Sequence, residues 1–508
     1  MTDLVAEFQR RMQQVASSGE SGGTELLLEL MGLSRAREFR LCAIPHQFDV
    51  EIFLALVPGV TADEARRRCE ELSPLSLVIP APEGLSVHES VRRNMFRQWL
   101  EPENREEFAA ASTRLVELFD DRITRLQGDR LETARRRRMF HLLGADPEQG
   151  FAEFERLSRA ARHGLLFGEC GSLIRLVHEY DAVLPQKHAL WLLYYEARLA
   201  SDLRNWQEAE LKFKQVLDAP NAPPELKVAS YRRLSYVLSE RRDWNGAIGL
   251  CQQAMELAES TPAAKHMLPR IVLDLGAAYR ESNDLERSEE LLRKSADLAA
   301  ASNNLSCLAA ARNSLGLLHL TRRDTQLAIA AFESSLEALT RNNEVFRTAQ
   351  VYNNLGLAFA NMPDWPSSEQ YFRKSLEIKA QAGDTLGQAN ALGNLARAQA
   401  GQGKLQEATQ SAERAIELFQ QMRDHYATAV ARHNLGRLYR RMQQKELAAK
   451  QLREASEMFN SLGKPTEAQA AAADLEAIDR KPGLPWWAWA AIGICAMLVI
   501  LAVIVLMS

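Results

Sequence analysis

The sequence has few cysteines and histidines and no phosphate-binding loop, and each shortage excludes a class of chemistry. Its six cysteines are scattered over 508 residues without a CxxC pair, which argues against a zinc site or a disulfide framework and for buried or reduced thiols in a reducing compartment. The ten histidines are widely separated, and neither a G-x-x-x-x-G-K-[ST] motif nor a nucleophile elbow occurs. We therefore expect no enzymatic activity, no metal and no cofactor.

An excess of one charge sign is also missing. Lysine and arginine together number 62, aspartate and glutamate 66, and the formal net charge is −4, which gives no overall attraction to nucleic acid. The first residues lack a basic region followed by an apolar run, so we expect no signal peptide. Ala, Leu, Glu, Arg and Gln dominate while β-branched residues are sparse, and this mixture predicts a mostly α-helical fold.

One long apolar run stands near the end of the sequence. Residues 486–507 contain no charge over 22 positions, which as a helix is about 33 Å long and matches a hydrocarbon core of about 30 Å. Three tryptophans lie at one end of the run, and Arg480 and Lys481 precede it, as expected for an aromatic belt and a cytosolic flank. We expect a transmembrane helix at 486–507 that tail-anchors the chain in a lipid bilayer, a linker at 480–485, and the bulk of the chain in the cytosol.

A 40-residue repeat is the strongest pattern in the sequence. A leucine followed by a small residue recurs at this interval, and further small residues follow 12 and 19 positions after the first one. The first two small residues would let helix A and helix B of a hairpin approach closely, and the third would seat the helix A of the next repeat. An aspartate in the turn between the helices predicts an N-cap for helix B at Asp284, Asp324 and Asp364. The small residues after leucine are Gly276, Gly316, Gly356, Ala396 and Gly436.

This pattern resembles the tetratricopeptide repeat (TPR), in which L-G-x-x-Y is followed by further small and aromatic positions. Segments such as Asn353–Phe359 and His433–Tyr439 resemble the long-helix TPRs of kinesin light chains and MalT-like regulators. The resemblance implies a TPR α-solenoid at 184–479, with about seven repeats and a capping helix from Thr466 to Ile478. Residues 121–183 are helical in pattern and are expected to form degenerate helix pairs.

The N-terminal part has a different pattern. Residues 1–24 end in a Ser/Gly-rich stretch and are expected to be a flexible segment. Within 25–120, three apolar helical stretches precede a helix that Thr61 and Glu64 would open with a capping box. Two short strands around a Pro/Gly turn and a further helix beginning near His88 follow.

This order of elements resembles the winged helix of STAND-type NTPases. The segments Cys42–Asp49 and His88–Arg92 carry the resemblance. In those NTPases the histidine can contact nucleotide, but no NTPase domain accompanies it here, so we expect a structural role for His88. The sequence therefore predicts a small winged-helix domain at 25–120.

Two groups of basic residues could serve nucleic acid or lipid. Arg66–Arg68 would lie on the recognition helix and Arg92, Arg93 and Arg97 on the next, but neighbouring glutamates dilute the first group. We therefore expect no nucleic-acid partner. The densest basic run, Arg135–Arg138, is interpreted as a solvated helix face, with contact to anionic lipid as the alternative.

Candidate ligand-binding residues lie on the A helices, which in TPR proteins line the concave face where extended peptides commonly bind. A ladder of asparagines could clamp a peptide backbone, since each amide is both donor and acceptor, and nearby arginines would favour an acidic ligand or a C-terminal carboxylate. Alternatively, the asparagines bond between neighbouring helices and the arginines form a solvated face. The candidates are Asn313, Asn353, Asn354, Asn394, Asn434, Arg397, Arg437, Arg440 and Arg441.

Together these patterns predict a membrane-tethered scaffold or adaptor that binds a protein or peptide partner in the groove of its TPR superhelix. Two alternatives remain open. One is a membrane-bound transcriptional or signalling regulator that uses the winged helix, and the other is the non-NTPase subunit of a split STAND-like system.

Overall fold

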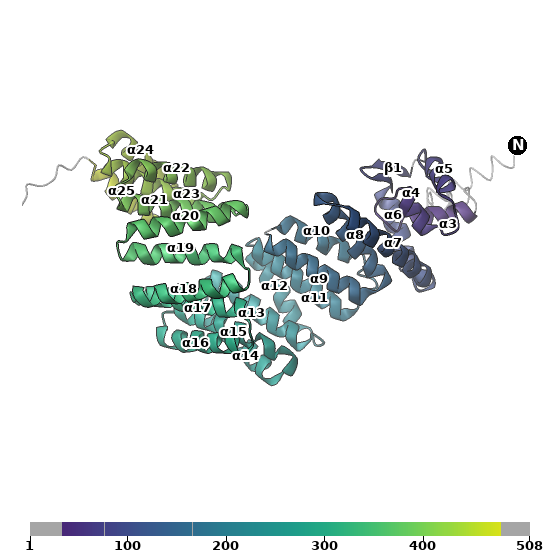
Figure 1. Cartoon of the computed structure of the whole chain (residues 1–508), viewed down its shortest axis with the longest axis horizontal. Helices are drawn as coiled ribbons and strands as arrows, with labels where there is room; N and C mark the ends of the chain where they lie inside the picture. The colour runs from purple at the N-terminus through teal and green to yellow at the C-terminus, as the bar shows by residue number, and fades with distance from the viewer. Residues whose placement is uncertain (1–32, 76, 165, 479–508) are drawn as a thin grey trace, which may run out of the picture. The chain divides into compact units, whose positions relative to one another are not determined.

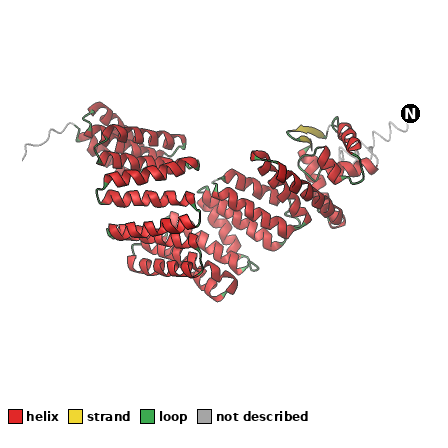
Figure 2. Cartoon of the chain, in the orientation of Figure 1, coloured by secondary structure: helices red, strands yellow, loops and turns green. Residues whose placement is uncertain are grey.

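The computed structural model describes residues 33–478 except 76 and 165, and α-helices make up most of this part (Figure 2). The chain divides into two compact units, Met1–Lys265 and His266–Ser508. The predicted flexible segment 1–24, linker 480–485 and transmembrane helix 486–507 lie outside the described residues. Within residues 33–478, no helix is long and apolar enough to cross a bilayer.

The described part of the first unit starts at residue 33 and contains three helices, a hairpin and a fourth helix; the first predicted helical stretch lies almost wholly outside the described residues. The capping box is present, with the backbone N–H of Glu64 donating to Thr61 Oγ1 at 3.3 Å and that of Thr61 donating to the Glu64 carboxylate at 2.9 Å. The elements are α3 (Leu33–Cys42), α4 (Val50–Leu56), α5 (Ala62–Leu72), β1 (Val78–Ala81), β2 (Gly84–Val87) and α6 (Glu89–Trp99). The strands are antiparallel, from Val78 opposite Val87 to Ala81 opposite Gly84.

The hairpin packs closely against the loop that precedes α4. Phe48 and Leu85 exchange two backbone hydrogen bonds of 2.7 and 2.8 Å. Gly84 has a φ of +126°, and a Cβ at this position would lie 2.5 Å from the carbonyl oxygen of Phe48. Glycine at this position therefore lets β2 approach the loop.

Helix pairs follow, and they share a core with the first elements. The boundary predicted after residue 120 does not coincide with this arrangement, because α7 continues through it to Arg125 and packs against α8. Rings from both sides of the boundary also pack against one another, edge-to-face or tilted, including Phe96, Phe108, Phe140 and Tyr180. The helices are η1 (Pro102–Asn104), α7 (Arg105–Arg125), α8 (Gly128–Ala145), α9 (Pro147–His163), α10 (Phe167–His178), α11 (Gln186–Asp202), α12 (Trp206–Asp218), α13 (Pro224–Glu240) and α14 (Trp244–Ser260).

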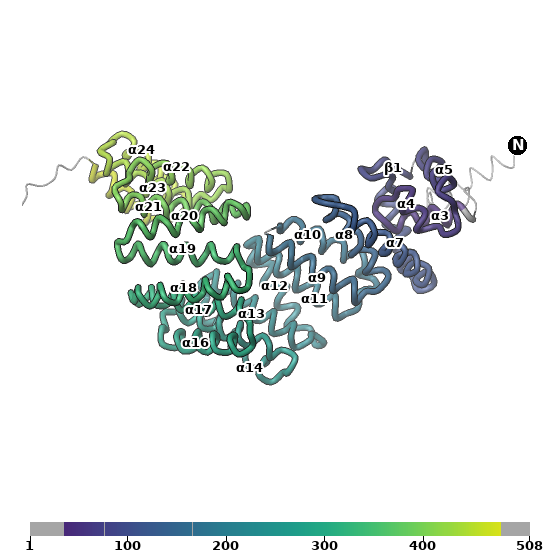
Figure 3. Tube along the Cα trace, in the orientation of Figure 1, coloured from purple at the N-terminus to yellow at the C-terminus, as the bar shows by residue number. Residues whose placement is uncertain are grey.

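The second unit consists of regular antiparallel helices joined by tight turns (Figures 1 and 3). Together with α11–α14 of the first unit, they make the predicted seven helix pairs and final capping helix, α25. After η2 (Pro262–Met267), the helices are α15 (Leu268–Glu281), α16 (Leu285–Ala301), α17 (Leu305–Thr321), α18 (Thr325–Arg341), α19 (Val345–Asn361), α20 (Trp365–Gln381), α21 (Thr385–Gly401), α22 (Leu405–Gln421), α23 (His425–Arg441), α24 (Lys445–Ser461) and α25 (Pro465–Glu476).

The 40-residue period follows from this geometry. Each helix from α16 to α24 has 17 residues and each connection between them has three. The middle residue of each connection has a positive φ, as at Asn303, and the next N–H bonds back to the preceding helix, as Asn304 does to the Ala299 carbonyl at 2.8 Å. This Schellman-type turn ends the B helices α16, α18, α20 and α22 without the proline that closes shorter repeats, while the turn after the A helix α19 contains Pro363.

The small residues of the repeat make room for close packing. A Cβ on Gly356 would lie 2.6 Å from the ring of Phe372 on helix B. The second small residue, Ser368, donates a hydrogen bond to the Gly356 carbonyl at 2.8 Å. The third, Ser375, is buried and donates a hydrogen bond to the Ala349 carbonyl of its own repeat's helix A at 2.7 Å. The equivalent Ser295 lies 4.0 Å from Cys307 on α17, the helix A of the next repeat.

The predicted N-caps are confirmed at two of three positions. The carboxylates of Asp284 and Asp364 each accept a hydrogen bond of 3.2 Å from the backbone N–H three residues later. Asp324 is the residue before α18, but its side chain makes no capping bond, so that prediction is wrong. Equivalent side-chain caps, which were not predicted, begin the A helices at Asn304, Asp384 and Asp424.

Two helical glycines of the second unit provide a test of this packing. We expect Gly316→Ala to destabilise the protein by about 1–3 kcal/mol through overpacking, because the new Cβ would lie 2.4 Å from the Phe332 ring. Gly393→Ala should instead stabilise it by about 0.5–1 kcal/mol, since a Cβ there meets no atom within 4 Å. Denaturant unfolding curves would show the opposite shifts, and shifts of the same sign would contradict this account.

Candidate functional site

A groove of about 730 Å³ lies in the second unit, on the face formed by α21 and α23. Its polar residues recur every three or four positions along each helix, which places them on one face. Apolar lining comes from these helices and from α22, and Trp365 and Tyr426 add aromatic surface. The polar lining consists of Asn390, Asn394 and Arg397 on α21 and Asn434, Arg437 and Arg441 on α23.

The charged side chains that line the groove are all arginines. Arg441 Nη2 donates to the Ala400 carbonyl at 2.8 Å, and Arg437 Nε lies 3.7 Å from Asp474. Arg397 has no ion pair within residues 33–478, and burial of part of the side chain against the groove walls lowers its pKa while the residue stays exposed. Since a guanidinium remains ionised in proteins, Arg397 offers an uncompensated cation to an anionic ligand.

Four of the predicted asparagines hydrogen-bond between repeats. Asn354 Nδ2 donates to Asn313 Oδ1, and Asn394 Nδ2 donates to Asn353 Oδ1, both at 2.9 Å. These bonds join the same two positions of consecutive A helices, which is the alternative that the sequence left open. Asn354 is also buried. A role of these four side chains in ligand binding therefore stays a prediction beside their observed role in joining repeats.

This ladder of side chains is interrupted at the groove. Gly393 occupies the position from which the preceding repeat would supply an acceptor for Asn434. The Asn434 side chain is exposed and makes no hydrogen bond within the described residues. Beyond the groove the ladder resumes, with His433 Nε2 2.9 Å from Asp474 Oδ2. The groove thus coincides with the missing rung.

Arg440 was predicted to bind ligand, but it does not line the groove. Its Nη1 lies 2.7 Å from Asp474 Oδ1 on the capping helix. Arg437 also approaches Asp474, at 3.7 Å, but it lines the groove together with Arg441. Asn390 also lines the groove and was not predicted. It could have been, because it lies four residues before Asn394 and therefore on the same helical face.

In the first unit, a buried ion pair joins Arg92 of α6 to Glu179 at the end of α10. Arg92 is 1% exposed, and its Nη2 donates to Glu179 Oε2 at 2.6 Å. His46 Nε2 lies 2.7 Å from the other carboxylate oxygen. Burial would raise the pKa of Glu179, but the hydrogen bond from His46 and the charge of Arg92 outweigh it, and the pKa is lowered. Arg92 is therefore a core residue and not part of a surface for DNA.

The other basic residues of this region are largely paired as well. Arg66 contacts Asp63 and Arg68 contacts Glu38. The run Arg135–Arg138, interpreted from the sequence as a solvated face, forms an ion pair at every position, with Glu132, Glu169, Glu83 and Asp120 in turn. His88 is exposed, and its Nδ1 lies 3.1 Å from Ser90 Oγ.

His178, at the end of α10, provides a pH-dependent contribution to stability. Hydrogen bonds with Glu196 and Asp181 outweigh partial burial and raise the pKa of His178 to about 9, against about 6.5 for an unperturbed histidine. This stabilisation is complete below pH of about 6.5 and is lost as the pH rises through 9. We expect the thermal midpoint of wild type to fall more steeply over this window than that of His178→Gln; parallel curves would contradict it.

Thiol and metal chemistry find little support in the described residues. Five cysteines there are buried and free, and the sixth, Cys495, lies outside the described range. Burial raises the pKa of Cys42 and raises that of Cys69 to about 11, so both thiols are protonated and unreactive at neutral pH. No group of three or more His, Cys, Asp or Glu side chains between residues 33 and 478 could hold a metal ion.

Comparisons with known proteins agree with this geometry. The sequence matches two family models for the tetratricopeptide repeat, at residues 347–421 and 428–462. A search of curated proteins finds no significant match. A signal transduction ATPase with numerous domains (STAND) with a tetratricopeptide repeat sensor, from Pyrococcus horikoshii, is similar in structure, with a TM-score of 0.56 and 15% identity over 91% of this chain and 62% of that one. The chain thus spans less than two thirds of that protein's length.

Two further structures match less closely. The Rap protein complexed with Competence and Sporulation Factor gives a TM-score of 0.45 and 16% identity over 65% of this chain and 96% of that one. A putative kinesin light chain repeat protein from Podosopora anserina gives 0.34 and 16% over 40% and 98%. Residues 347–421 and 428–462 are therefore tetratricopeptide repeats in a TPR-like α-solenoid, and they supply most of the groove lining.

Proposed function

We propose that this protein is a TPR scaffold that binds an acidic, extended segment of a partner protein in the groove of α21 and α23. The observation that carries the proposal is the charge of the groove: its ionised lining is arginine alone, in a chain whose net charge is −4. Concave sites with apolar walls and a few polar groups are typical of ligand binding. A peptide carboxylate would bind Arg397, and the Asn434 amide would bond to the peptide backbone.

A binding assay tests this proposal directly. Fluorescence polarisation would compare labelled peptides of equal length, one rich in Asp and Glu and one rich in Lys, against the full chain in mild detergent. We expect saturable binding of the acidic peptide that weakens as salt is added, because exposed charges are screened. Equal binding of both peptides, or of neither, would contradict the proposal.

We also propose that residues 486–507 tether the scaffold to a membrane. The support is the uncharged 22-residue run itself together with its flanking tryptophans and basic residues. Flotation of the full chain with liposomes, resistant to alkaline carbonate and lost when 486–507 are deleted, would support tethering. A deletion variant that floats equally well would refute it.

A second candidate function is the non-NTPase subunit of a split STAND-like system, with a winged helix at the N-terminal end of the chain. It is favoured by the fold likeness to a STAND protein over 91% of this chain and by the order of α3–α6 around the hairpin. Co-purification with a separate P-loop protein would distinguish this role from that of a peptide scaffold. Purified chain that hydrolyses nucleotide by itself would contradict both.

A further inference from the structure

Helices α21 and α23 run in the same direction on either side of the groove in the second unit. Both are A helices, and the antiparallel α22 separates them in the sequence. The hydrogen bond from Arg441 Nη2 to the Ala400 carbonyl, of 2.8 Å, places their C-terminal ends next to each other. The groove therefore runs along the helix axes, and the order of the lining residues on each helix gives the chemistry of its two ends.

The end near the N-termini of the two helices is apolar. No charged residue lines this half of the groove. The ring of Phe419 on α22 packs in one apolar cluster with alanines of both helices, and Tyr426 adds a ring that is 45% exposed. This end offers apolar surface to a ligand and no group that would bind a charge. The alanines of the cluster that line the groove are Ala389, Ala427 and Ala431.

The opposite end is basic. Arg397, Arg437 and Arg441 lie on the C-terminal halves of α21 and α23, and no carboxylate is among the lining residues. Trp365 also lines this end, with its ring against Gly401, the last residue of α21. The charge that the groove presents is therefore concentrated at one end.

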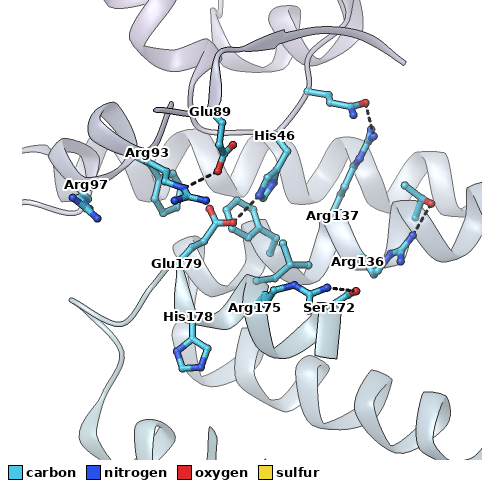
Figure 4. A pocket seen from close by; sticks show the side chains of 15 residues that line it. His46, Glu89, Arg93, Arg97, Arg136, Arg137, Ser172, Arg175, His178 and Glu179 are labelled. Carbon is cyan, nitrogen blue, oxygen red and sulfur yellow. Dashed lines mark hydrogen bonds and ion pairs between the residues drawn. The ribbon is translucent and has the colours of Figure 1, made fainter. Parts of the chain in front are cut away.

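The pocket of the first unit, of about 680 Å³, has a different arrangement (Figure 4). Its lining contains both acidic and basic side chains, and these pair with one another. Glu89 lies 2.8 Å from Arg93, and Glu179 lies 2.7 Å from His46; dashed lines join both pairs in Figure 4. A lining that carries charge of one sign and keeps it apart from the apolar residues thus distinguishes the groove of the second unit from this pocket.

We propose that the groove selects a partner segment whose acidic residues lie at one end and whose apolar residues lie at the other. The proposal rests on the peptide binding proposed above and adds the order of residues in the ligand. Each end of such a segment would meet lining of matching chemistry. A segment in which the two classes are mixed would place a carboxylate against the apolar end, where no partner compensates its loss of water.

The length of the groove sets the length of this segment. Tyr426 and Arg441 are 15 residues apart on α23, which corresponds to about 22 Å of helix. An extended chain advances about 3.3 Å per residue and would span this distance with about seven residues. The recognised segment is therefore short, and it lies along two repeats instead of crossing the whole stack.

Fluorescence polarisation of the full chain in mild detergent, with three labelled peptides of equal length and equal charge, tests the order of residues. The first combines Asp and Glu with Ser and Gly. The second carries Asp and Glu in one half and Leu and Phe in the other, and the third mixes the residues of the second. We expect the second to bind at least about tenfold more tightly than the other two, because it alone buries large apolar side chains at the apolar end.

A substitution at the apolar end locates the effect. Tyr426→Ser should weaken the second peptide at least about threefold through the lost apolar contact and leave the first unchanged, which also reports that the variant is folded. The matched control is Tyr236→Ser, since Tyr236 of α13 is also 45% exposed and does not line the groove. This control should bind all three peptides as wild type does.

The outcomes separate this proposal from the one on which it rests. Wild type that fails to bind the first peptide contradicts acidic-peptide binding itself. Wild type that binds the first peptide, but binds the second no more tightly than the third, leaves the scaffold function in place and overturns the order inferred for the ligand. Second-peptide affinity that is unchanged in Tyr426→Ser, or equally reduced in Tyr236→Ser, would also overturn it.

Discussion

Arg397→Glu is expected to weaken the binding of an acidic peptide about a hundredfold. Removing one charged hydrogen-bond partner costs about 1.5–3 kcal/mol, and the new carboxylate also repels the ligand. The effect should be large because Arg397 has no ion pair in the described chain and lies in a groove whose other charges are also positive. Arg397→Gln should show the smaller loss of the hydrogen bond alone, of roughly tenfold.

The matched control for this experiment is Arg323→Glu. Arg323 is an exposed residue in the turn between α17 and α18 and does not line the groove. The two variants change the net charge equally, so a general electrostatic effect would weaken binding in both. Peptide affinity that falls alike in both variants, or in neither, would argue against the groove as the binding site.

The interrupted ladder allows a second change at the same site. Gly393→Asn would place an acceptor where Asn434 now has none, as Asn353 serves Asn394. The new side chain would occupy part of the groove, so peptide binding should weaken while stability is maintained or increased. This combination distinguishes a filled groove from a damaged fold.

The second large effect is expected at the buried ion pair of the first unit. Glu179→Ala would leave the Arg92 guanidinium, which is 1% exposed, without its carboxylate at 2.6 Å. Breaking a buried pair from one side costs about 3–5 kcal/mol, because the remaining charge stays desolvated. Since Arg92 Nε keeps the Glu89 carboxylate at 3.3 Å, we expect a loss at the lower end of this range. Denaturant unfolding of the full chain should show this loss in the transition of the first unit.

An exposed ion pair of the same unit serves as the control. Asp121 and Arg125 lie one helical turn apart on α7, with side chains 52% and 70% exposed, so Asp121→Ala should change stability by less than about 1 kcal/mol. The lowered pKa of Glu179 adds a pH signature: its stabilisation is present above the unfolded-state pKa of about 4.3 and is lost as the pH falls through the lower folded-state value. Equal effects of the two substitutions would show that Arg92 is not dependent on Glu179.

The repeat architecture could be predicted because its packing rules are local. Gly316 and Gly356 of helix A lie against the rings of Phe332 and Phe372 of helix B, and Ser368 of helix B donates a hydrogen bond to the Gly356 carbonyl. Because each repeat needs such small residues at these positions, they recur in the sequence every 40 residues. The first helices, the hairpin and the Thr61 capping box were readable for the same reason. The sequence did not show that α7 continues past residue 120, where a domain boundary was predicted. No glycine or proline between residues 105 and 125 marks where this helix ends.

The pairing of side chains was harder to predict, because it depends on contacts between distant segments. Arg137 meets Glu83 and Arg92 meets Glu179, and neither spacing follows from helical periodicity. The ladder was partly readable, since the first position of each rung holds Asn313, Asn353, Gly393 and His433 at 40-residue intervals. Gly393 lies at the groove, but its role became clear only from the hydrogen bonds that the asparagines make at the equivalent positions.

The missing rung also has a mechanical consequence. Neighbouring repeats bear a pulling force in series, because each contacts only the repeats beside it. The α21–α23 junction lacks the amide bridge that joins α17 to α19 and α19 to α21, so under tension this seam should part before those two. A ligand that contacts both α21 and α23 would bridge the junction that lacks this hydrogen bond, and we expect it to raise the force needed to separate these two repeats.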